Sequence, residues 1–288
     1  MNDNKIALVT GSSTGIGLET ALALARNGFY TYASMRNLDK SNKIADAAKS
    51  EGLPLRVIEL DVNNEVSVYS AIDIISKEKN RLDVLVNNAG YGLFGSLEDL
   101  TIDEIRDLFE TNYFGIVRLI KNSLPLMRKG KGRRTIVNIS SVGGRIGAPI
   151  LSAYQSTKFA VEGLSESLYY ELEPFGIKVV IIEPGFIKTN IMNSSIQARG
   201  SSTPDSPYFQ VTNKIEAYFR SMVNDNPSVT SPSEVATVIL DAIKSDNPKL
   251  RYLVGQDAYQ IIAAKNQLPE TEFLQMIKKQ FTEMPNNK

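Results

Sequence analysis

Short runs of apolar, often β-branched residues alternate with longer segments of helical periodicity along most of the chain. Near-continuous apolar runs are typical of strands that are buried on both faces of a sheet. They predict strands at 5–9, 30–34, 55–60, 84–87, 135–139, 178–182 and 251–254. The segments between them predict helices at 16–27, 41–50, 66–79, 102–128, about 152–173 and 232–244. This alternation predicts an α/β fold with a doubly wound, parallel sheet of about seven strands and helices on both faces.

One segment departs from the alternation. Residues 193–207 are rich in Ser, Thr, Pro and Gly, and an amphipathic stretch with Phe209, Ile215, Phe219 and Met222 follows them. A long loop inside a compact domain is often a lid, so we expect a substrate lid at about 188–230; a surface excursion without a role is the alternative. The chain shows no repeats and no clear boundary, so we expect a single domain over 1–288 with a helical tail at about 256–288.

Composition restricts the chemistry. Lys+Arg and Asp+Glu both total 32, so net charge gives no reason to expect a nucleic-acid partner. Cysteine and histidine are both absent, which excludes disulfides, a Ser-His-Asp triad, a cysteine nucleophile and a His or Cys metal site. A general acid or base must therefore be Asp, Glu, Lys or Tyr.

The same features bear on location. The lack of cysteine fits a reducing compartment. No apolar run approaches the length that crosses a bilayer, and the N-terminal segment lacks the apolar stretch of a signal peptide. We therefore expect a cytoplasmic protein without a membrane span.

The first predicted strand ends in a glycine-rich turn that opens a helix. The turn reads TGSSTGIG, with GxxxGxG spacing. Glycines allow the backbone to approach a pyrophosphate closely, and a helix N-terminus favours anionic oxygens. Gly-Ser turns before helices are also common without a ligand, but the strand and helix on either side favour a dinucleotide site. The expected contacts are Gly11, Ser12, Ser13, Thr14, Gly15, Ile16 and Gly17.

The residue type after the second strand bears on the cofactor. Arg36 stands near the point where an acidic residue would bind a ribose 2′-hydroxyl. Its forked cation suits a 2′-phosphate instead, with Ser12 as a helper. This favours NADP over NAD, and an exposed turn arginine is the alternative.

The next two strand ends supply further candidates. Asp61 and Val62 follow the third strand, where Asp61 could contact adenine or could cap the next helix. The turn NNAG follows the fourth strand at the edge where open parallel sheets bind ligands. We expect Asn88, Ala89 and Gly90 to line the cofactor cleft, and Asn87 to be structural.

A tyrosine and a lysine are the candidates for the chemistry. Tyr154 and Lys158 lie four residues apart in SAYQSTKFAV, so a helix would place them on one face. A phenol with a pKa near ~10 is a poor base at neutral pH. An ammonium about 4 Å away, at an effective dielectric of about 20, would favour the phenolate by about 4 kcal/mol, or about three pKa units before the cost of burial. Packing with a snorkelling lysine is the alternative.

Together these motifs resemble the short-chain dehydrogenase/reductase family. The match comprises TGSSTGIG, NNAG, Asn112, Ser141 thirteen residues before Tyr154, YQSTK and the turn Pro184-Gly185. It covers residues of about 5–190 in the family's order and spacing. The resemblance implies a Rossmann fold with Tyr154 as general acid/base and Ser141 steadying the carbonyl or hydroxyl.

The resemblance also implies roles for other positions. Lys158 would bind the nicotinamide ribose, and Asn112 would hold a water in a proton relay. Pro184, Gly185 and Ile187 would lie at the cofactor, and Thr189 would touch the nicotinamide carboxamide. Members of the family often form dimers or tetramers, so we expect a homo-oligomer.

Apolar residues near the expected cleft bear on the substrate. They predict a pocket for a lipophilic carbonyl or secondary alcohol, with a role in the core as the alternative. The candidates are Tyr91, Leu93, Phe94, Ile146, Ala148, Pro149, Ile150 and Leu151, and we expect Leu93, Ile146 and Leu151 to contact substrate together with Ser141 and Tyr154. The segments YASMRNLDKS, SPSEVATVILDAI and RYLVG resemble the hydroxysteroid and retinol dehydrogenase-like branch.

These expectations combine into an NADP-dependent oxidoreductase that interconverts a lipophilic carbonyl and a secondary alcohol by hydride transfer. A non-catalytic NADP(H)-binding regulatory protein is the alternative from another class. A sugar-nucleotide epimerase or dehydratase would share the Tyr–Lys chemistry but usually needs a larger substrate domain.

Overall fold

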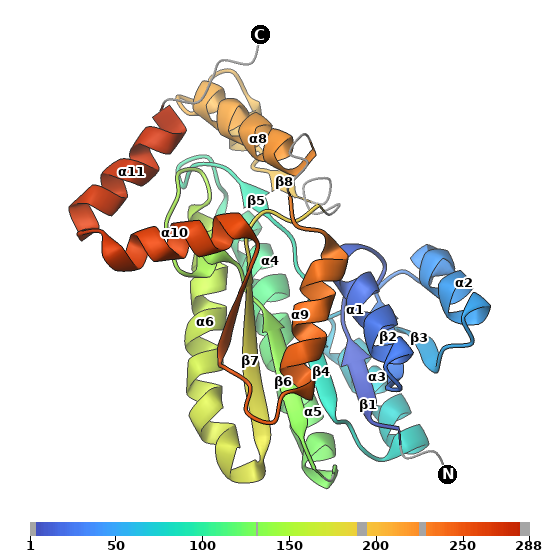
Figure 1. The fold of residues 1–288 in the computed structure, drawn as a ribbon. Coiled ribbons are helices and arrows are strands. Elements are labelled where there is room, and N and C mark those ends of the chain that lie inside the picture. The colour runs from blue at the N-terminus through green and yellow to red at the C-terminus, as the bar shows by residue number, and fades with distance from the viewer. Residues whose placement is uncertain (1–3, 131, 189–194, 225–228, 283–288) are drawn as a thin grey trace.

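Seven parallel strands form one sheet, in the order β3-β2-β1-β4-β6-β7-β9 (Figure 1). The computed structural model describes residues 4–130, 132–188, 195–224 and 229–282. The strands are β1 (Ile6–Val9), β2 (Tyr30–Met35), β3 (Leu55–Glu59), β4 (Val84–Asn87), β6 (Arg134–Ile139), β7 (Ile177–Pro184) and β9 (Arg251–Val254). The seven strands predicted from the apolar runs are thereby confirmed.

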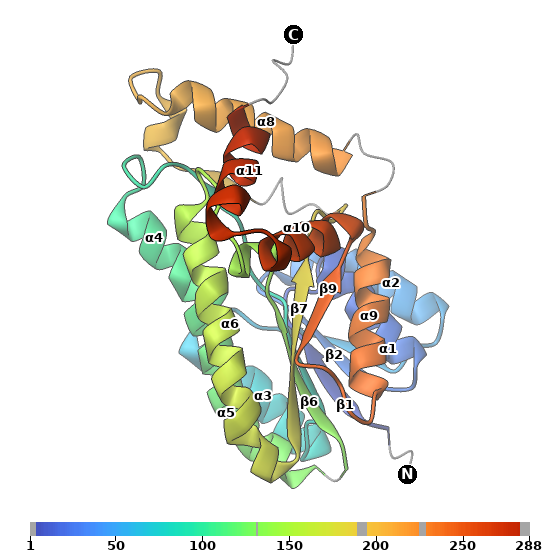
Figure 2. The same ribbon diagram turned by 60° about the vertical axis from the view of Figure 1, so that its left-hand side comes forward.

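Helices cover both faces of the sheet (Figure 2). One face carries α1 (Gly15–Arg26), α2 (Asn42–Ser50) and α9 (Pro232–Lys244), and the other carries α3 (Glu65–Lys79), α5 (Gly115–Lys129) and α6 (Ser152–Leu172). Alternate residues of a strand point to opposite faces. Accordingly, Ile6 and Leu8 of β1 pack in the core of the second face, and Ala7 and Val9 pack in that of the first.

The strand order reverses direction at β1. The chain runs outward from β1 through β2 to β3, and then returns to β4 on the other side of β1. In open parallel sheets, ligands bind outside the carboxyl ends of the strands at such a reversal. The topology therefore brings the turns after β1 and β4 together at one edge of the sheet.

The predicted helix at 102–128 is interrupted. It consists of α4 (Ile102–Phe109), a π-helical turn (Glu110–Phe114) and α5. Inside the turn, the Asn112 side-chain amide forms hydrogen bonds with both the backbone N–H and the backbone carbonyl of Tyr91, 21 residues earlier in the chain. A π-helical turn inserts an extra residue into a helix and is frequent at functional sites.

Elements beyond the sheet cover its carboxyl edge. A two-stranded sheet, β5 (Leu93–Phe94) with β8 (Ile196–Gln197), was not predicted. α8 (Phe209–Asn224) lies above it in Figure 1, and α10 (Gln256–Gln267) and α11 (Glu270–Thr282) lie over the same edge of the main sheet (Figures 1 and 2). α10 and α11 occupy the described part of the predicted helical tail. The predicted lid at 188–230 contains β8 and α8 in its described parts, and residues 189–194 and 225–228 lie outside them. Within the ranges described, every helix is too short or too polar to cross a membrane.

The central strands should dominate stability. Leu85 of β4 is fully buried, whereas Leu97, in a loop, is 66% exposed. We expect Leu85→Ala to reduce the free energy of unfolding by about 2–5 kcal/mol because it leaves a cavity. Leu97→Ala makes the same chemical change at the surface and should cost less than about 0.5 kcal/mol. Urea unfolding checks both variants, and equal losses would contradict the assigned core.

Candidate active site

The glycine turn after β1 is held in shape by its neighbours. Gly11 and Gly15 adopt positive φ values of +67° and +58°, which favour glycine. A Cβ on Gly17 would lie 2.4 Å from the Gly11 carbonyl oxygen. Asn88, after β4, donates hydrogen bonds from Nδ2 to the carbonyls of Thr10 (2.8 Å) and Gly11 (3.2 Å). The turn is therefore fixed with its backbone at the N-terminus of α1.

A cleft of about 530 Å³ extends from this turn along the carboxyl ends of the strands. Eleven predicted cofactor residues line it: Gly11, Ser13, Thr14, Gly15, Ile16, Arg36, Asp61, Val62, Asn88, Ala89 and Gly90. Lys40, which the sequence did not single out, lines it beside Arg36. Both cations are exposed, and neither forms an ion pair within the described ranges. An open cleft lined by a glycine turn and by two cations without carboxylate partners fits a phosphorylated dinucleotide.

Two predictions about this cleft need correction. Ser12 is fully buried and donates from Oγ to the Val9 carbonyl at 2.9 Å, so its side chain cannot help Arg36. Asp61 does not cap the helix that follows, because Asn64 is the N-cap of α3. The Asp61 carboxylate accepts the Asn63 amide at 3.0 Å and faces the cleft.

Asn87 lies beneath the cleft and is structural, as expected. It is buried, and its Nδ2 donates to Asn138 Oδ1 of β6 at 2.8 Å. Asn138 in turn donates to Ser165 Oγ of α6 at 2.8 Å. These bonds tie two central strands to α6, the helix that carries Tyr154 and Lys158.

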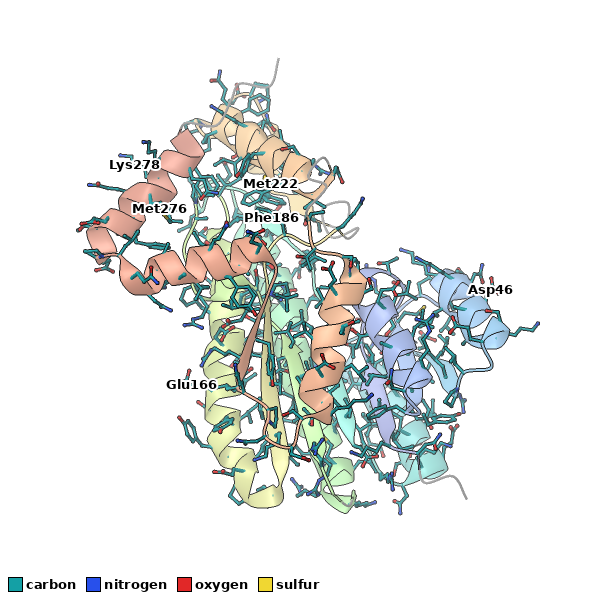
Figure 3. The ribbon with its side chains drawn as sticks, viewed as in Figure 1. Asp46, Glu166, Phe186, Met222, Met276 and Lys278 are labelled. Atoms are coloured by element: carbon teal, nitrogen blue, oxygen red, sulfur yellow. The ribbon has the colours of Figure 1, made fainter. Side chains whose placement is uncertain are left out.

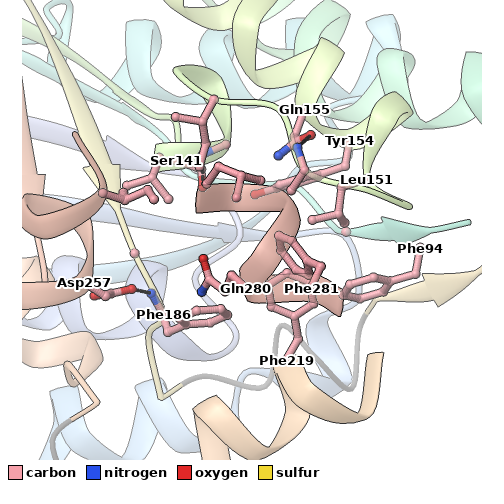
Figure 4. Close-up of a pocket in the computed structure, with 18 of the residues that line it drawn as sticks. Phe94, Ser141, Leu151, Tyr154, Gln155, Phe186, Phe219, Asp257, Gln280 and Phe281 are labelled. Atoms are coloured by element: carbon pink, nitrogen blue, oxygen red, sulfur yellow. Dashed lines mark hydrogen bonds between the residues drawn. The ribbon is translucent and has the colours of Figure 1, made fainter. Parts of the chain in front are cut away.

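A second, mainly apolar pocket of about 230 Å³ lies at the same edge of the sheet, and we call it the aromatic pocket after Phe94, Tyr154, Phe186, Phe219 and Phe281 in its lining. Figure 4 shows Ser141 and Tyr154 on one side of it, with Phe186, Phe219 and Phe281 on the other. Of the predicted substrate residues, Ser141, Ile146, Leu151 and Tyr154 line the pocket.

Leu93, by contrast, does not line this pocket. It is 2% exposed and packs with Leu100 and Leu108. Successive residues of a strand point to opposite sides, so its neighbour Phe94 faces the pocket instead.

The far wall of the pocket was missed in the sequence. It includes Ile277, Gln280 and Phe281 of α11. The apolar spacing of Phe273, Ile277 and Phe281 is that of an amphipathic helix. That spacing shows which face is buried but not where the helix docks.

Ser141 and Tyr154 meet at the pocket wall. Ser141 Oγ accepts the Gly143 amide at 3.0 Å and donates to the Pro184 carbonyl at 3.5 Å, which fixes the hydroxyl at the ends of β6 and β7. Burial raises the pKa of Tyr154 above its usual value, and the Ser141 hydroxyl offsets part of this rise. The phenol is therefore held in its protonated form.

The expected effect of Lys158 on this tyrosine is not met. Lys158 Nζ lies 5.8 Å from the Tyr154 ring centroid and donates to the Ile139 carbonyl of β6 at 3.0 Å. Burial lowers the pKa of Lys158 to about 8, and the nearby Glu162 carboxylate counteracts part of this effect. In the protein alone, desolvation outweighs the attraction between ammonium and phenolate.

Asn112 lies behind the site. It is 1% exposed and lines neither pocket. Its Oδ1 accepts the Tyr91 amide at 3.0 Å, while Nδ2 donates to the Tyr91 carbonyl (2.9 Å) and to Thr157 Oγ1 of α6 (3.2 Å). The Asn112 side chain thus joins the segment after β4 to α6, and its polar atoms are all engaged with protein.

The segment after β7 is only partly at the site. The buried Pro184 ends β7, and Gly185 lines the aromatic pocket. A Cβ on Gly185 would lie 2.1 Å from the Asp257 carboxylate, which accepts the Phe186 amide at 2.7 Å. Ile187 packs in the core beneath, and Thr189 lies outside the described residues.

Comparisons with known proteins agree with this geometry. Residues 5–200 match the model of the short chain dehydrogenase family. The chain belongs to the short-chain dehydrogenase/reductase family. It is 37% identical to an uncharacterized oxidoreductase, YusZ, of Bacillus subtilis, over 96% of this chain and 98% of that protein.

Two further relatives place it within this family. It is 34% identical to mouse 17-beta-hydroxysteroid dehydrogenase type 1, over 87% of this chain and 73% of that protein. A crystal structure of a short-chain dehydrogenase from Streptomyces avermitilis superposes with a TM-score of 0.80 at 32% identity, covering 98% and 96% of the two chains. The predicted resemblance and the predicted fold are therefore confirmed, and the chain is an oxidoreductase with a nucleotide-binding fold.

The buried lysine of this dehydrogenase should lower its stability. Since folding lowers the Lys158 pKa from 10.5 to about 8, the unfolded chain binds more protons between these values, and stability rises with pH there. Below pH 8, burying the charged Lys158 lowers the free energy of unfolding by about 3 kcal/mol. We expect Lys158→Met to be more stable than the wild type by about 2 kcal/mol at pH 7, because a hydrogen bond is also lost.

Urea unfolding at pH 7 and pH 10 measures this difference, which should shrink at the higher pH. Lys121→Met, at an exposed position of α5, is the matched control and should change stability little at either pH. A Lys158→Met protein that is less stable than the wild type at pH 7 would contradict the assigned burial.

Proposed function

We propose that this protein is an NADP-dependent oxidoreductase that interconverts a lipophilic carbonyl compound and its secondary alcohol, with Tyr154 as the general acid/base. The observation that carries the proposal is the Tyr154 phenol itself. It is partly buried at the wall of the aromatic pocket, beside Ser141, one helical turn from a buried lysine. In a chain without histidine, this is an acid/base group in a mainly apolar site.

The protonation of Tyr154 favours reduction. A bound reduced nicotinamide would supply a hydride to the carbonyl carbon. As the C=O π electrons move to oxygen, the Tyr154 hydroxyl would transfer its proton to that oxygen, and the Ser141 hydroxyl would donate a hydrogen bond to it. The tyrosinate that is left would be stabilised by the Lys158 ammonium. A phenol whose pKa is raised by burial is suited to the acid role in this direction.

The residues that line the pocket support the proposal of an apolar, ring-bearing substrate. Phe219 of α8 lies 5.8 Å from Phe94, 5.2 Å from Phe186 and 6.1 Å from Phe281 between ring centroids. Phenylalanine faces bind flat apolar groups well and offer few partners to the hydroxyls of a sugar. The name of the mouse relative, a hydroxysteroid dehydrogenase, supports the same class.

Two cations support a preference for NADP. Arg36 and Lys40 both line the cleft, and neither has a carboxylate partner within the described parts of the chain. A 2′-phosphate would accept charge-assisted hydrogen bonds from both. A cytoplasmic location and a homo-oligomeric state stay predictions from the sequence.

Tyr154→Phe tests the acid/base role. We expect kcat/KM for NADPH oxidation with hydrophobic ketones and aldehydes to fall about 100- to 10,000-fold, because the proton donor is lost. Affinity for NADPH should change little. Tyr170→Phe, on the same helix with a side chain 65% exposed, is the control and should keep wild-type turnover. Equal turnover by Tyr154→Phe and the wild type would refute the acid/base role of Tyr154.

The wild-type protein tests the non-catalytic alternative. Tight NADPH binding by a wild type that reduces none of these ketones and aldehydes would favour that alternative.

Arg36→Asp tests the cofactor preference. Losing a charge-assisted contact costs about 1.5–3 kcal/mol, so the Kd for NADPH should rise at least about 10- to 100-fold, while that for NADH stays level or falls. Fluorescence titration measures both constants. Lys43→Asp makes a comparable charge reversal at an exposed site of α2 that does not line the cleft, and should affect neither cofactor strongly. Equal weakening of NADPH and NADH by Arg36→Asp would defeat the preference.

A further inference from the structure

A cluster of charged side chains lies beneath the Tyr154–Lys158 pair, where α6 packs against β7 and β9. Three carboxylates face two guanidinium groups and the Lys158 ammonium, so the charges balance. The cluster consists of Glu162, Glu166, Glu183, Arg145, Arg251 and Lys158.

Arg251 of β9 is the hub of this charge cluster. Its Nε lies 3.0 Å from Glu162 and 3.5 Å from Glu183, and its Nη2 lies 2.6 Å from Glu166. Glu183 of β7 is 1% exposed and also pairs with Arg145 at 2.9 Å. A buried carboxylate requires such partners, because an unpaired one is strongly destabilising. The fork of Arg251 therefore fixes Glu162 and Glu183 on two neighbouring elements.

Glu162 is the carboxylate nearest to the site along α6. It follows Lys158 by one helical turn, and its side chain is 7% exposed. Oε2 accepts a hydrogen bond from Arg251 Nε, whereas Oε1 is buried and has no well-formed hydrogen bond within the described residues, although Ser140 lies beside the carboxylate. Within the described residues, the Glu162 carboxylate and the Lys158 ammonium do not form a direct ion pair. The negative charge of Glu162 therefore acts on the ammonium through the protein interior, where it is poorly screened.

The charges that face this pair come from every element around it. Tyr154 and Glu166 lie on α6, Glu183 on β7, Arg251 on β9, and Arg145 follows the turn after β6. Among all these charged groups and Glu162, it is Glu162 that acts appreciably on the pKa of Lys158, and it favours the charged form of the lysine. Burial and the charge of Glu183 raise the pKa of Glu162, while Ser140 and Arg251 act in the opposite direction. Arg251 thus helps to keep Glu162 ionised.

We propose that Glu162, held by Arg251, is a positioning residue of the active site that keeps the buried Lys158 side chain in its ammonium form. The inference rests on the proposed function for its catalytic meaning: only a charged Lys158 stabilises the tyrosinate formed at Tyr154. The effect of the buried Glu162 charge on the buried Lys158 ammonium does not itself depend on any substrate.

The test is Glu162→Gln, with Glu166→Gln as the matched control. Both variants remove a carboxylate from Arg251 on the same face of α6. Glu166, however, is 52% exposed, lies one turn further from Lys158 and stands at the edge of the molecule in Figure 3. The pKa of Lys158 is measured by NMR in protein with ¹³C-labelled lysine ε-carbons, where the signal missing from Lys158→Met identifies it.

The wild-type titration should give about 8. We expect Glu162→Gln to lower this value by about one unit, Glu166→Gln to leave it within about 0.3 unit, and Glu162→Asp, which keeps the charge, to restore most of it. The pH at which kcat/KM for carbonyl reduction declines on the alkaline side should move down by the same amount in Glu162→Gln. An unchanged Lys158 pKa in folded Glu162→Gln, or an equal shift in Glu166→Gln, would overturn the proposal.

If Glu162→Gln does not fold because Arg251 loses its most buried close partner, the double variant Glu162→Gln with Arg251→Gln removes both charges and should show the same downward shift. The outcomes separate the two proposals. A shifted Lys158 pKa without turnover of any carbonyl compound would refute the proposed function alone. Normal carbonyl reduction with an unmoved Lys158 pKa would refute the role of Glu162 alone.

Discussion

Lys158 carries its ammonium into the protein interior, where it donates a hydrogen bond to the Ile139 carbonyl at the end of β6. Taking such a charge out of water costs several kcal/mol, and one hydrogen bond repays only part of that cost. The rest of the site depends on this burial. Burial lowers the pKa of the lysine, so that a nearby carboxylate is needed to stabilise its charged form, and it places the ammonium beneath Tyr154. An exposed lysine at the same helical spacing would be screened by solvent and would do little for a phenolate.

The elements that achieve this burial come from widely separated parts of the chain. The parallel sheet brings the ends of β4, β6 and β7 to one edge, and α6 runs along them with Tyr154 and Lys158 at its first turns. The C-terminal elements then complete the site in two ways. β9 contributes Arg251 beneath the lysine, and α11 contributes Phe281 to the far wall of the aromatic pocket. The pocket and its electrostatic support therefore both depend on residues near the C-terminal end, which lie beyond the segment matched by the family model.

The sequence predicted the sheet well because continuous apolar runs are a local signal. Most of the predicted cofactor residues line one cleft for a similar reason, since each turn follows a strand whose carboxyl end is known. The failures are non-local. The helix at 102–128 is broken by bonds between Asn112 and a residue 21 positions away, and the pairing of β5 with β8 decides that Phe94 rather than Leu93 faces the pocket. One signal was present and unused: Glu183 interrupts the apolar run of β7, and a carboxylate in such a strand must find a cation.

We propose that the Tyr154–Lys158 pair supports direct hydride transfer to a carbonyl carbon. The most direct measurement is reduction of an aromatic ketone with NADPH that carries deuterium at the transferring C4 position, followed by mass spectrometry of the alcohol. We expect one deuterium on the carbinol carbon of the product. An alcohol without deuterium, or no alcohol at all from a protein that binds NADPH tightly, would contradict it.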